Sequence, residues 1–202
     1  MFITFEGGEG TGKSTQVKML AMRLTGEGVD VLATREPGGT PEAESVRSLL
    51  VSGDVTRWSP EAEALLNYAA RDSHLRGLIR PALAEGKTVL CDRFMDSTRA
   101  YQGYAGNCAF HLIDELERSI IGETKPNLTL IFDLDPAAGL ARAHSRGDGS
   151  EDRYERKGLD FHHRLRTGFL SIAKAEPKRC RLIDASRSIE EVSDQIWQSL
   201  RG

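Results

Sequence analysis

The sequence predicts an α/β fold in three layers, in which a five-stranded parallel sheet lies between two layers of helices. Short apolar runs alternate along the chain with helical patterns, as is typical of a parallel sheet covered by helices on both faces. A glycine-rich segment at 7–14 follows the first apolar run and precedes an amphipathic helix. The chain has 202 residues, which suits a single domain, 1–202, with one hydrophobic core.

The five strands are expected at 2–6, 29–35, 88–92, 128–133 and 181–184. Each of these segments is short and mostly apolar. That composition is expected for strands that are buried on both faces, as the strands of parallel sheets are.

The helices are predicted from apolar spacing and from their first residues. Apolar side chains recur with helical spacing on one face of the first helix, at Val17, Leu20, Ala21 and Leu24. Three later helices should begin where a capping side chain precedes a proline, at Thr40-Pro41, Ser59-Pro60 and Asp135-Pro136. Ser188 and Glu191 form a capping box for the last helix.

Charge and composition exclude several classes of protein. The net charge is −3, with Lys and Arg spread along the chain, which argues against a dedicated nucleic-acid binder. No apolar run approaches the roughly 18 residues that span a bilayer, and the N-terminus does not resemble a signal peptide. Cys91, Cys108 and Cys180 lack metal-type spacing and are odd in number. We therefore expect a cytoplasmic protein with no membrane or nucleic-acid partner.

The glycine-rich segment, GGEGTGKS at 7–14, fits the phosphate-binding pattern G-x-x-x-x-G-K-[ST]. Its glycines let backbone N–H groups approach phosphate oxygens, and the helix that follows adds a favourable dipole. Lys13 can reach the β- and γ-phosphates, and the Ser14 hydroxyl can ligate Mg²⁺. The sequence therefore predicts a P-loop fold that binds ATP or GTP. The expected nucleotide-binding residues are Gly7, Gly8, Glu9, Gly10, Thr11, Gly12, Lys13, Ser14 and Thr15.

Two further features narrow the class of nucleotide enzyme. GTPase switches carry Asp-x-x-Gly and Asn-Lys-x-Asp elements, and neither string occurs in the chain. A polar stretch at 146–158, RGDGSEDRYERKG, predicts a mobile surface loop, which we call the lid. A kinase of a small acceptor is favoured by elimination. A nucleotide-dependent switch remains the alternative from another class.

Further strings in the chain resemble those of thymidylate kinases. They are REPGGT at 35–40, AAR at 69–71, DRF at 92–94, STRAYQG at 97–103 and DRYE at 152–155, and they follow the family's order. The resemblance implies transfer of the γ-phosphoryl group of ATP to dTMP, with Mg²⁺, by a homodimer. A kinase of another nucleoside monophosphate or of a deoxynucleoside is the nearest alternative.

The resemblance also implies roles for individual residues. Arg93 and Arg47 match the arginines on the acceptor phosphate, and Arg forks suit phosphate oxygens. Asp92 matches an acidic residue that binds Mg²⁺ indirectly or orients Arg93. The family's substrate contacts further match Glu9 and Tyr101 at the sugar, Arg71, Thr98 and Gln102 at the base, and Glu36 and Pro37 beside them. Arg142 and Ala185-Ser186 match positions around adenine.

The chain departs from the family pattern at the base and matches one of its variants at the lid. Asn67 stands where the family usually has a phenylalanine that stacks on thymine, so Tyr68 or Phe94 substitutes, or base selectivity differs. The cradle offers no arginine, which resembles the bacterial type with a catalytic lid arginine. We expect Arg153 to reach the phosphates when the lid closes, with Arg146 and Arg156 as alternatives. The expected catalytic residues are Lys13, Arg93, Arg153 and Asp92, with the metal at Ser14 and Asp92.

Overall fold

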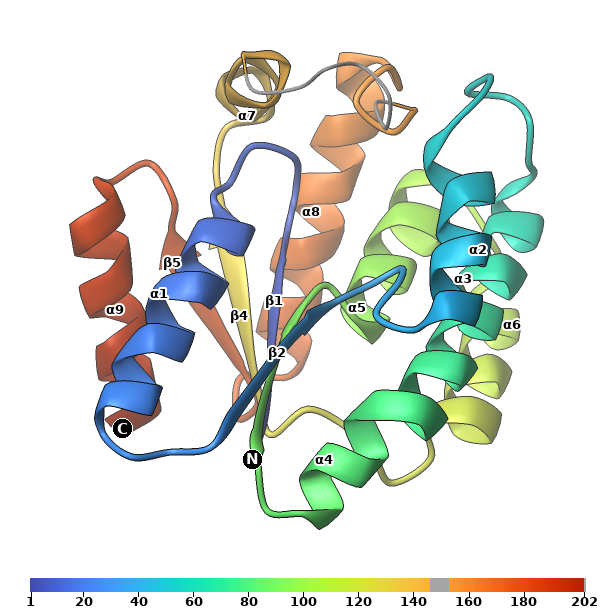
Figure 1. The fold of residues 1–202 in the computed structure, drawn as a ribbon. Helices are drawn as coiled ribbons and strands as arrows, with labels where there is room; N and C mark the ends of the chain where they lie inside the picture. Colours follow the sequence, from blue (N-terminus) through green and yellow to red (C-terminus); the bar gives the residue numbers. More distant parts are fainter. Residues whose placement is uncertain (146–152, 202) are drawn as a thin grey trace.

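The central sheet is parallel and its strands lie in the order β2-β3-β1-β4-β5 (Figure 1). A computed structural model of the protein describes residues 1–145 and 153–201. The strands are β1 (Phe2–Gly7), β2 (Val31–Arg35), β3 (Thr88–Asp92), β4 (Leu128–Asp133) and β5 (Cys180–Asp184). The predicted five-stranded parallel sheet is confirmed.

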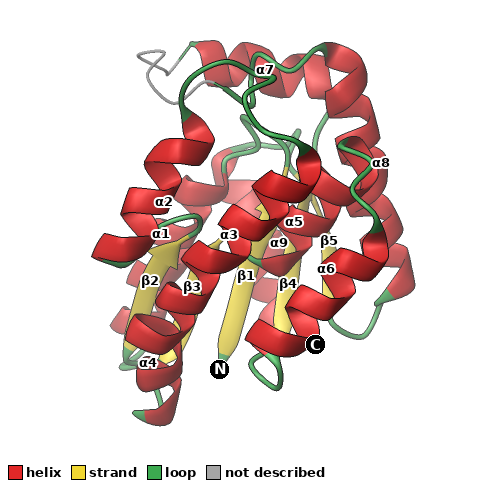
Figure 2. Cartoon of the chain, turned by 90° about the vertical axis from the view of Figure 1, so that its right-hand side faces the viewer, coloured by secondary structure: helices red, strands yellow, loops and turns green. Residues whose placement is uncertain are grey.

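Helices cover both faces of the sheet, which gives three layers (Figures 1 and 2). One face carries α1 (Lys13–Gly26) and α9 (Ile189–Arg201), whose apolar residues form one core with β1 and β4. The other face carries α3 (Pro60–His74), α5 (Met95–Thr98), α6 (Phe110–Leu116) and α8 (Leu159–Ala175). The remaining α-helices are α2 (Pro41–Val51), α4 (Arg80–Ala84) and α7 (Pro136–His144).

The predicted helix starts are confirmed by their caps. The side chains of Thr40, Ser59 and Asp135 each accept a hydrogen bond from a backbone N–H three residues later. The capping box also forms, because the N–H of Ser188 donates to the Glu191 carboxylate and the N–H of Glu191 donates to the Ser188 hydroxyl. These contacts satisfy N–H groups that have no partner inside the helix.

Strand boundaries differ from the prediction by one or two residues. β2 begins at Val31, because the N–H of Val29 donates to Leu24 O and closes the end of α1 beyond Gly28, whose φ is +82°. β1 extends to Gly7, which pairs with Phe132, and β5 begins at Cys180, which pairs with Thr129. The apolar pattern alone does not reveal these end pairings.

Within residues 1–145 and 153–201, three π-helical segments interrupt the helices: Leu75–Ile79, Arg99–Ala105 and Glu117–Ile121. The sequence analysis predicted none of them. The second carries Tyr101 and Gln102, both buried, and packs against α8. A π-helical turn widens the helix, and such turns often occur at functional sites.

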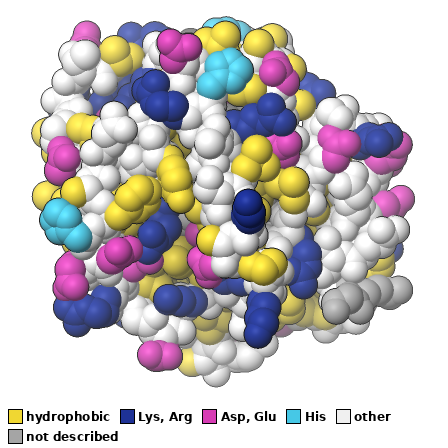
Figure 3. All heavy atoms as spheres, turned by 180° about the vertical axis from the view of Figure 1, so that it is seen from behind, with side chains coloured by type: hydrophobic (Ala, Val, Ile, Leu, Met, Phe, Trp, Pro, Cys, Tyr) yellow, Lys and Arg dark blue, Asp and Glu magenta, His cyan; other side chains and the backbone are white. Residues whose placement is uncertain are grey.

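The distribution of charged side chains on the surface and the state of the cysteines agree with what the composition indicates. Figure 3 shows Lys and Arg side chains scattered among acidic and apolar ones over the described part of the face seen from behind. None of the helices in the described residues is long and apolar enough to cross a membrane. All three cysteines are free thiols and buried.

A buried carboxyl group on β1 fixes the backbone that follows β3. The Glu6 side chain is fully buried and accepts hydrogen bonds from the Phe94 N–H, at 2.8 Å, and from the Ser97 hydroxyl. Burial, and then the nearby Asp96 carboxylate, raise the pKa of Glu6 to about 7. Glu6 thereby joins the end of β1 to the segment after β3 that carries Phe94 and Ser97.

The raised pKa of Glu6 predicts a pH-dependent stability. The folded protein binds a proton that the unfolded chain releases above its ordinary pKa of 4.5. This contribution to stability is therefore complete below pH 4.5 and is lost as the pH rises through about 7. Relative to Glu6→Gln, the wild type should lose on the order of 3 kcal/mol in its free energy of unfolding between pH 4.5 and 8. Urea denaturation measures both proteins, and parallel pH curves would contradict the assignment.

Candidate active site

The phosphate cradle lies between the end of β1 and the first turn of α1. Gly10 and Gly12 adopt positive φ values of +67° and +88°. A Cβ atom added at Gly10 would lie 1.9 Å from the carbonyl oxygen of Gly139, so only glycine allows α7 to approach this loop. The structure thus forms the turn that the glycine pattern predicted.

Lys13 is folded over the cradle and is buried. Its ammonium group donates to Gly8 O at 2.7 Å and to the Thr11 hydroxyl at 3.1 Å. Burial, and then the Arg93 cation, lower the pKa of Lys13 to about 8. An anion placed in the cradle would favour the charged form of this lysine.

Ser14, in the first turn of α1, contacts Asp92 at the end of β3. The Ser14 hydroxyl donates to the Asp92 carboxylate. Hydroxyl and carboxylate oxygens are hard ligands, and Mg²⁺ usually needs only one or two protein ligands beside phosphate oxygens. Among the described residues no cluster of three or more acidic, His or Cys side chains could hold a metal ion. The pair fits a cation that is held mainly by phosphates.

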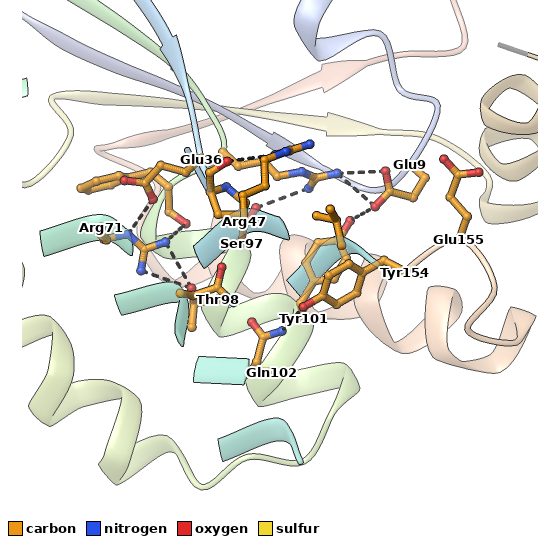
Figure 4. A pocket seen from close by; sticks show the side chains of 15 residues that line it. Glu9, Glu36, Arg47, Arg71, Ser97, Thr98, Tyr101, Gln102, Tyr154 and Glu155 are labelled. Atoms are coloured by element: carbon orange, nitrogen blue, oxygen red, sulfur yellow. Dashed lines mark hydrogen bonds and ion pairs between the residues drawn. The ribbon is translucent and has the colours of Figure 1, made fainter. Parts of the chain in front are cut away.

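Arg93, Glu9 and Tyr101 form a connected group beside the cradle. The Arg93 guanidinium donates to both oxygens of Glu9 at 3.1 Å, and the Tyr101 hydroxyl donates to Glu9 at 2.6 Å (Figure 4). Burial alone would raise the pKa of Glu9, but the Arg93 and Lys13 cations outweigh it and lower this pKa to about 2. Glu9 is therefore ionised at neutral pH.

A second cavity adjoins this group, and Figure 4 shows the side chains that line it. Its lining includes all the residues that the family resemblance assigned to the acceptor: Glu9, Glu36, Pro37, Arg47, Arg71, Arg93, Thr98, Tyr101 and Gln102. Asn67, Phe94, Ser97, Val51, Tyr154 and Glu155 complete it. The structure therefore brings the predicted acceptor residues together.

The Arg71 guanidinium is held rigidly in this pocket. Arg71 donates to the Glu36 carboxylate at 2.7 Å, to Phe94 O at 2.9 Å and to the Thr98 hydroxyl at 3.2 Å. The second oxygen of Glu36 lies 3.0 Å from Nδ1 of His74. These buried contacts fix the direction of the Arg71 guanidinium where it lines the cavity.

The aromatic residue at the base side is Phe94 rather than Tyr68. Both side chains are fully buried, but only Phe94 is among the residues that line the cavity. The Arg71 guanidinium lies 4.5 Å from the Tyr68 ring centroid and 5.1 Å from that of Phe94. Asn67 lines the cavity, and its amide nitrogen donates to Glu63 O at 2.8 Å. Of the two substitutes considered, only Phe94 is placed to contact a base.

The cavity over the cradle and the acceptor cavity adjoin each other. Four residues, Glu9, Glu36, Arg47 and Arg93, line both the acceptor cavity and the cavity over the cradle. Arg47 extends from α2 and donates to Pro37 O at 2.9 Å. On the opposite side of the cradle, Arg142 donates to Ala185 O at 3.0 Å, so the residues assigned to adenine also meet.

Arg153 is the one predicted catalytic residue that the structure does not place at the phosphates. Its guanidinium is fully buried and donates to the carbonyl oxygens of Leu50, Asp54 and Val55 at 2.8–3.2 Å. A fourth bond joins it to the Glu63 carboxylate at 2.6 Å. Because four of its five N–H groups are engaged, Arg153 acts here as a structural tie between the lid and the end of α2.

The alternatives to Arg153 are only partly described. Arg156 donates to Gly53 O at 2.6 Å and is likewise directed to the loop after α2. The predicted alternative Arg146 lies outside the described residues, as does most of the lid, 146–152.

Sequence analysis missed Glu63, which is buried beneath the acceptor cavity. The sequence did contain one signal for its position. Glu63, Asn67 and Arg71 are spaced four residues apart and therefore lie on one face of α3. An acidic residue in the first turn of a helix is ordinary, however, and does not by itself indicate a site.

A phosphate cradle that opens into an acceptor cavity, on a five-stranded parallel sheet, defines a P-loop kinase of a small acceptor. The family model of thymidylate kinase matches residues 5–196. The chain is 56% identical to a thymidylate kinase of Caulobacter vibrioides, over 96% of this chain and 93% of that one. It is 54% identical to one of Bradyrhizobium sp., over 99% and 89%. The chain belongs to the thymidylate kinase family.

A solved structure agrees with the sequence comparison. The crystal structure of a thymidylate kinase from Ehrlichia chaffeensis aligns with a TM-score of 0.81 and 38% identity, covering 100% of this chain and 98% of that one. The layered fold described above is therefore the fold of that enzyme.

The burial of Arg153 predicts that its loss destabilises the fold. Arg153→Ala would leave Glu63 without its closest cation and would free three backbone carbonyls. Breaking a buried ion pair in this way typically costs about 3–5 kcal/mol. Denaturant unfolding measures the loss, with Arg76→Ala, an exposed arginine on the same face of the sheet, as the control. A stable variant with kcat reduced by orders of magnitude would instead restore Arg153 to the chemistry.

Proposed function

We propose that this protein transfers the γ-phosphoryl group of ATP to dTMP, giving dTDP and ADP, a step toward dTTP. The observation that carries the proposal is that the two cavities adjoin, with four charged residues lining both. A nucleotide in the cradle and a monophosphate in the acceptor cavity would present their phosphates to each other at this junction. Membership of the thymidylate kinase family supports the identity of the acceptor.

The transfer needs no general base. The second pKa of a phosphate monoester is about 6, so the acceptor oxygen is largely ionised at neutral pH. The site therefore has to align the donor and acceptor phosphates and to neutralise their negative charge. Lys13 is placed on the donor side, while Arg93 and Arg47 are placed at the junction. The acceptor phosphate oxygen forms a bond to the γ-phosphorus of ATP while the bond from that phosphorus to the β,γ-bridging oxygen breaks, so that dTDP forms and ADP leaves with that oxygen.

Ser14 and Asp92 would hold Mg²⁺, which would offset the negative charge of the ATP phosphates. The fit rests on the hydrogen bond that already joins these two hard oxygen ligands. If this is right, Asp92→Asn should raise the Mg²⁺ concentration for half-maximal rate, and an unchanged requirement would remove Asp92 from the site.

The acceptor cavity accounts for recognition of a pyrimidine deoxynucleotide. Arg71 lines the cavity, and the one Nη1 N–H that it does not give to Thr98 would donate to a thymine carbonyl oxygen. Phe94 supplies an aromatic face. Tyr101 is held against Glu9 beside the junction, where its ring would exclude a ribose 2′-hydroxyl.

The protein is proposed to act as a cytoplasmic homodimer. Support comes from exposed apolar side chains on three neighbouring helices: Leu49 on α2, Leu65 on α3 and Phe110 on α6 (Figure 2). Sedimentation should give a particle of twice the 22.3 kDa chain mass, and a monomer at micromolar concentration would refute the dimer.

The acceptor is tested by a coupled assay of ADP formation with dTMP, dUMP, dCMP, AMP and GMP. The highest kcat/KM should belong to dTMP, because the pocket offers donors to a base carbonyl and a tyrosine at the sugar. Preference for any other monophosphate would refute the substrate. Release of free phosphate irrespective of acceptor would indicate a nucleotide-dependent switch instead.

A further inference from the structure

Glu63 is a carboxylate buried beneath the acceptor cavity that the reaction itself does not use. It lies in the first turn of α3 and is 1% exposed. A carboxylate in such a place is stable only if hydrogen bonds and cations satisfy it. Four donors meet this requirement, and they come from two separate parts of the chain.

Three of the donors belong to residues 153–158, the described end of the lid. Arg153 and Lys157 donate to Oε1 of Glu63 at 2.6 and 3.2 Å. The Tyr154 hydroxyl donates to Oε2 at 3.2 Å. Tyr154 itself lines the acceptor cavity and packs edge-on against Tyr101, with ring centroids 5.4 Å apart. The carboxylate therefore holds this segment against the cavity.

The fourth donor is Gln102, which the family resemblance assigned to the base. Its amide nitrogen lies 2.8 Å from Oε2 of Glu63 and 3.5 Å from the Tyr154 hydroxyl oxygen. An ionised carboxylate can only accept, so the group facing Glu63 must be the NH₂ of the amide. The amide oxygen is then turned to the other side, and Figure 4 shows it on the side of Thr98.

We propose that Glu63 is a positioning residue that couples the anchoring of residues 153–158 to the reading of the acceptor base. By taking the Gln102 NH₂, it makes Gln102 present an acceptor to the cavity, while Nη1 of Arg71, which gives one N–H to Thr98, keeps its second N–H as a donor. Thymine offers the complement, an N3–H donor beside a carbonyl oxygen. Cytosine offers the reverse at both positions, an unprotonated N3 beside an amino group. This inference rests on the proposed function.

Replacement of Glu63 by Gln should reverse the Gln102 amide. The carbonyl oxygen of a glutamine at 63 would stay with Arg153, whose N–H lies closest. Its NH₂ would then face the Gln102 NH₂, and two donors cannot pair. Turning the Gln102 amide over restores the hydrogen bond but presents NH₂ to the base. The variant should therefore lose its preference for thymine, rather than lose activity with every acceptor alike.

The experiment compares kcat/KM and calorimetric Kd for dTMP and dCMP in the wild type, Glu63→Gln and Glu61→Gln. Glu61 is the matched control, because it is an exposed glutamate in the same turn of α3. In Glu63→Gln the dTMP/dCMP ratio should fall at least tenfold, as expected when a site's buried hydrogen-bonding group no longer matches its ligand. In Glu61→Gln it should stay within about twofold of the wild type. Equal losses for dTMP and dCMP in Glu63→Gln would show a structural role only and overturn the proposal.

A second variant keeps the test decisive if Glu63→Gln does not fold, which circular dichroism and thermal unfolding would reveal. Gln102→Met removes the amide and leaves the Arg153–Glu63 ion pair in place, so its dTMP/dCMP ratio should also fall at least tenfold. A wild-type ratio in Gln102→Met would overturn the proposal by itself. In the Gln102→Met background, Glu63→Gln should change the ratio no further. A wild type that forms no dTDP would refute the proposed function, while the two binding constants would still test the inference.

Discussion

The ion pair between Glu9 and Arg93 is the contact on which the arrangement of the site depends. Glu9 follows β1 and Arg93 follows β3, and these parallel strands are neighbours, so their carboxyl ends meet at one edge of the sheet. The pair lies where the phosphate cradle opens into the acceptor cavity. Tyr101 attaches the acceptor side to it, and Lys13 lies on the donor side. One partly buried cluster of charged residues thus fixes the junction at which two phosphates would meet.

Features encoded by neighbouring residues could be predicted from the sequence. The capping residues Thr40, Ser59 and Asp135, the glycine turn at 7–14 and the apolar strands depend on local backbone chemistry, and the structure contains all of them. The acceptor residues were located only through the resemblance to thymidylate kinases. Their convergence then follows from the parallel order of the strands, since segments after β2 and β3 lie at the same edge as the cradle.

Features that depend on contacts between distant segments could not be predicted. A polar loop that contains Arg153 suggests a solvated or catalytic cation, whereas burial of this arginine results from carbonyl groups about 100 residues earlier in the chain. The same holds for Glu63, whose four donors follow it by 39 to 94 residues. The π-helical segment Arg99–Ala105 has no local sequence signal either, although it places Tyr101 and Gln102. Polar contacts between segments far apart in the sequence therefore determine the roles of Arg153 and Glu63, which the spacing of residues along the chain does not reveal.

The central claim is that the cradle and the acceptor cavity form one continuous site for two phosphate chains. A single molecule in which adenosine and thymidine are joined by five phosphates tests it directly, because such a chain must occupy both cavities and cross the Glu9–Arg93 junction. Steady-state inhibition should be competitive with ATP and also with dTMP, with one molecule bound per chain by calorimetry. Competition with only one of the two substrates, or two molecules bound per chain, would contradict the account.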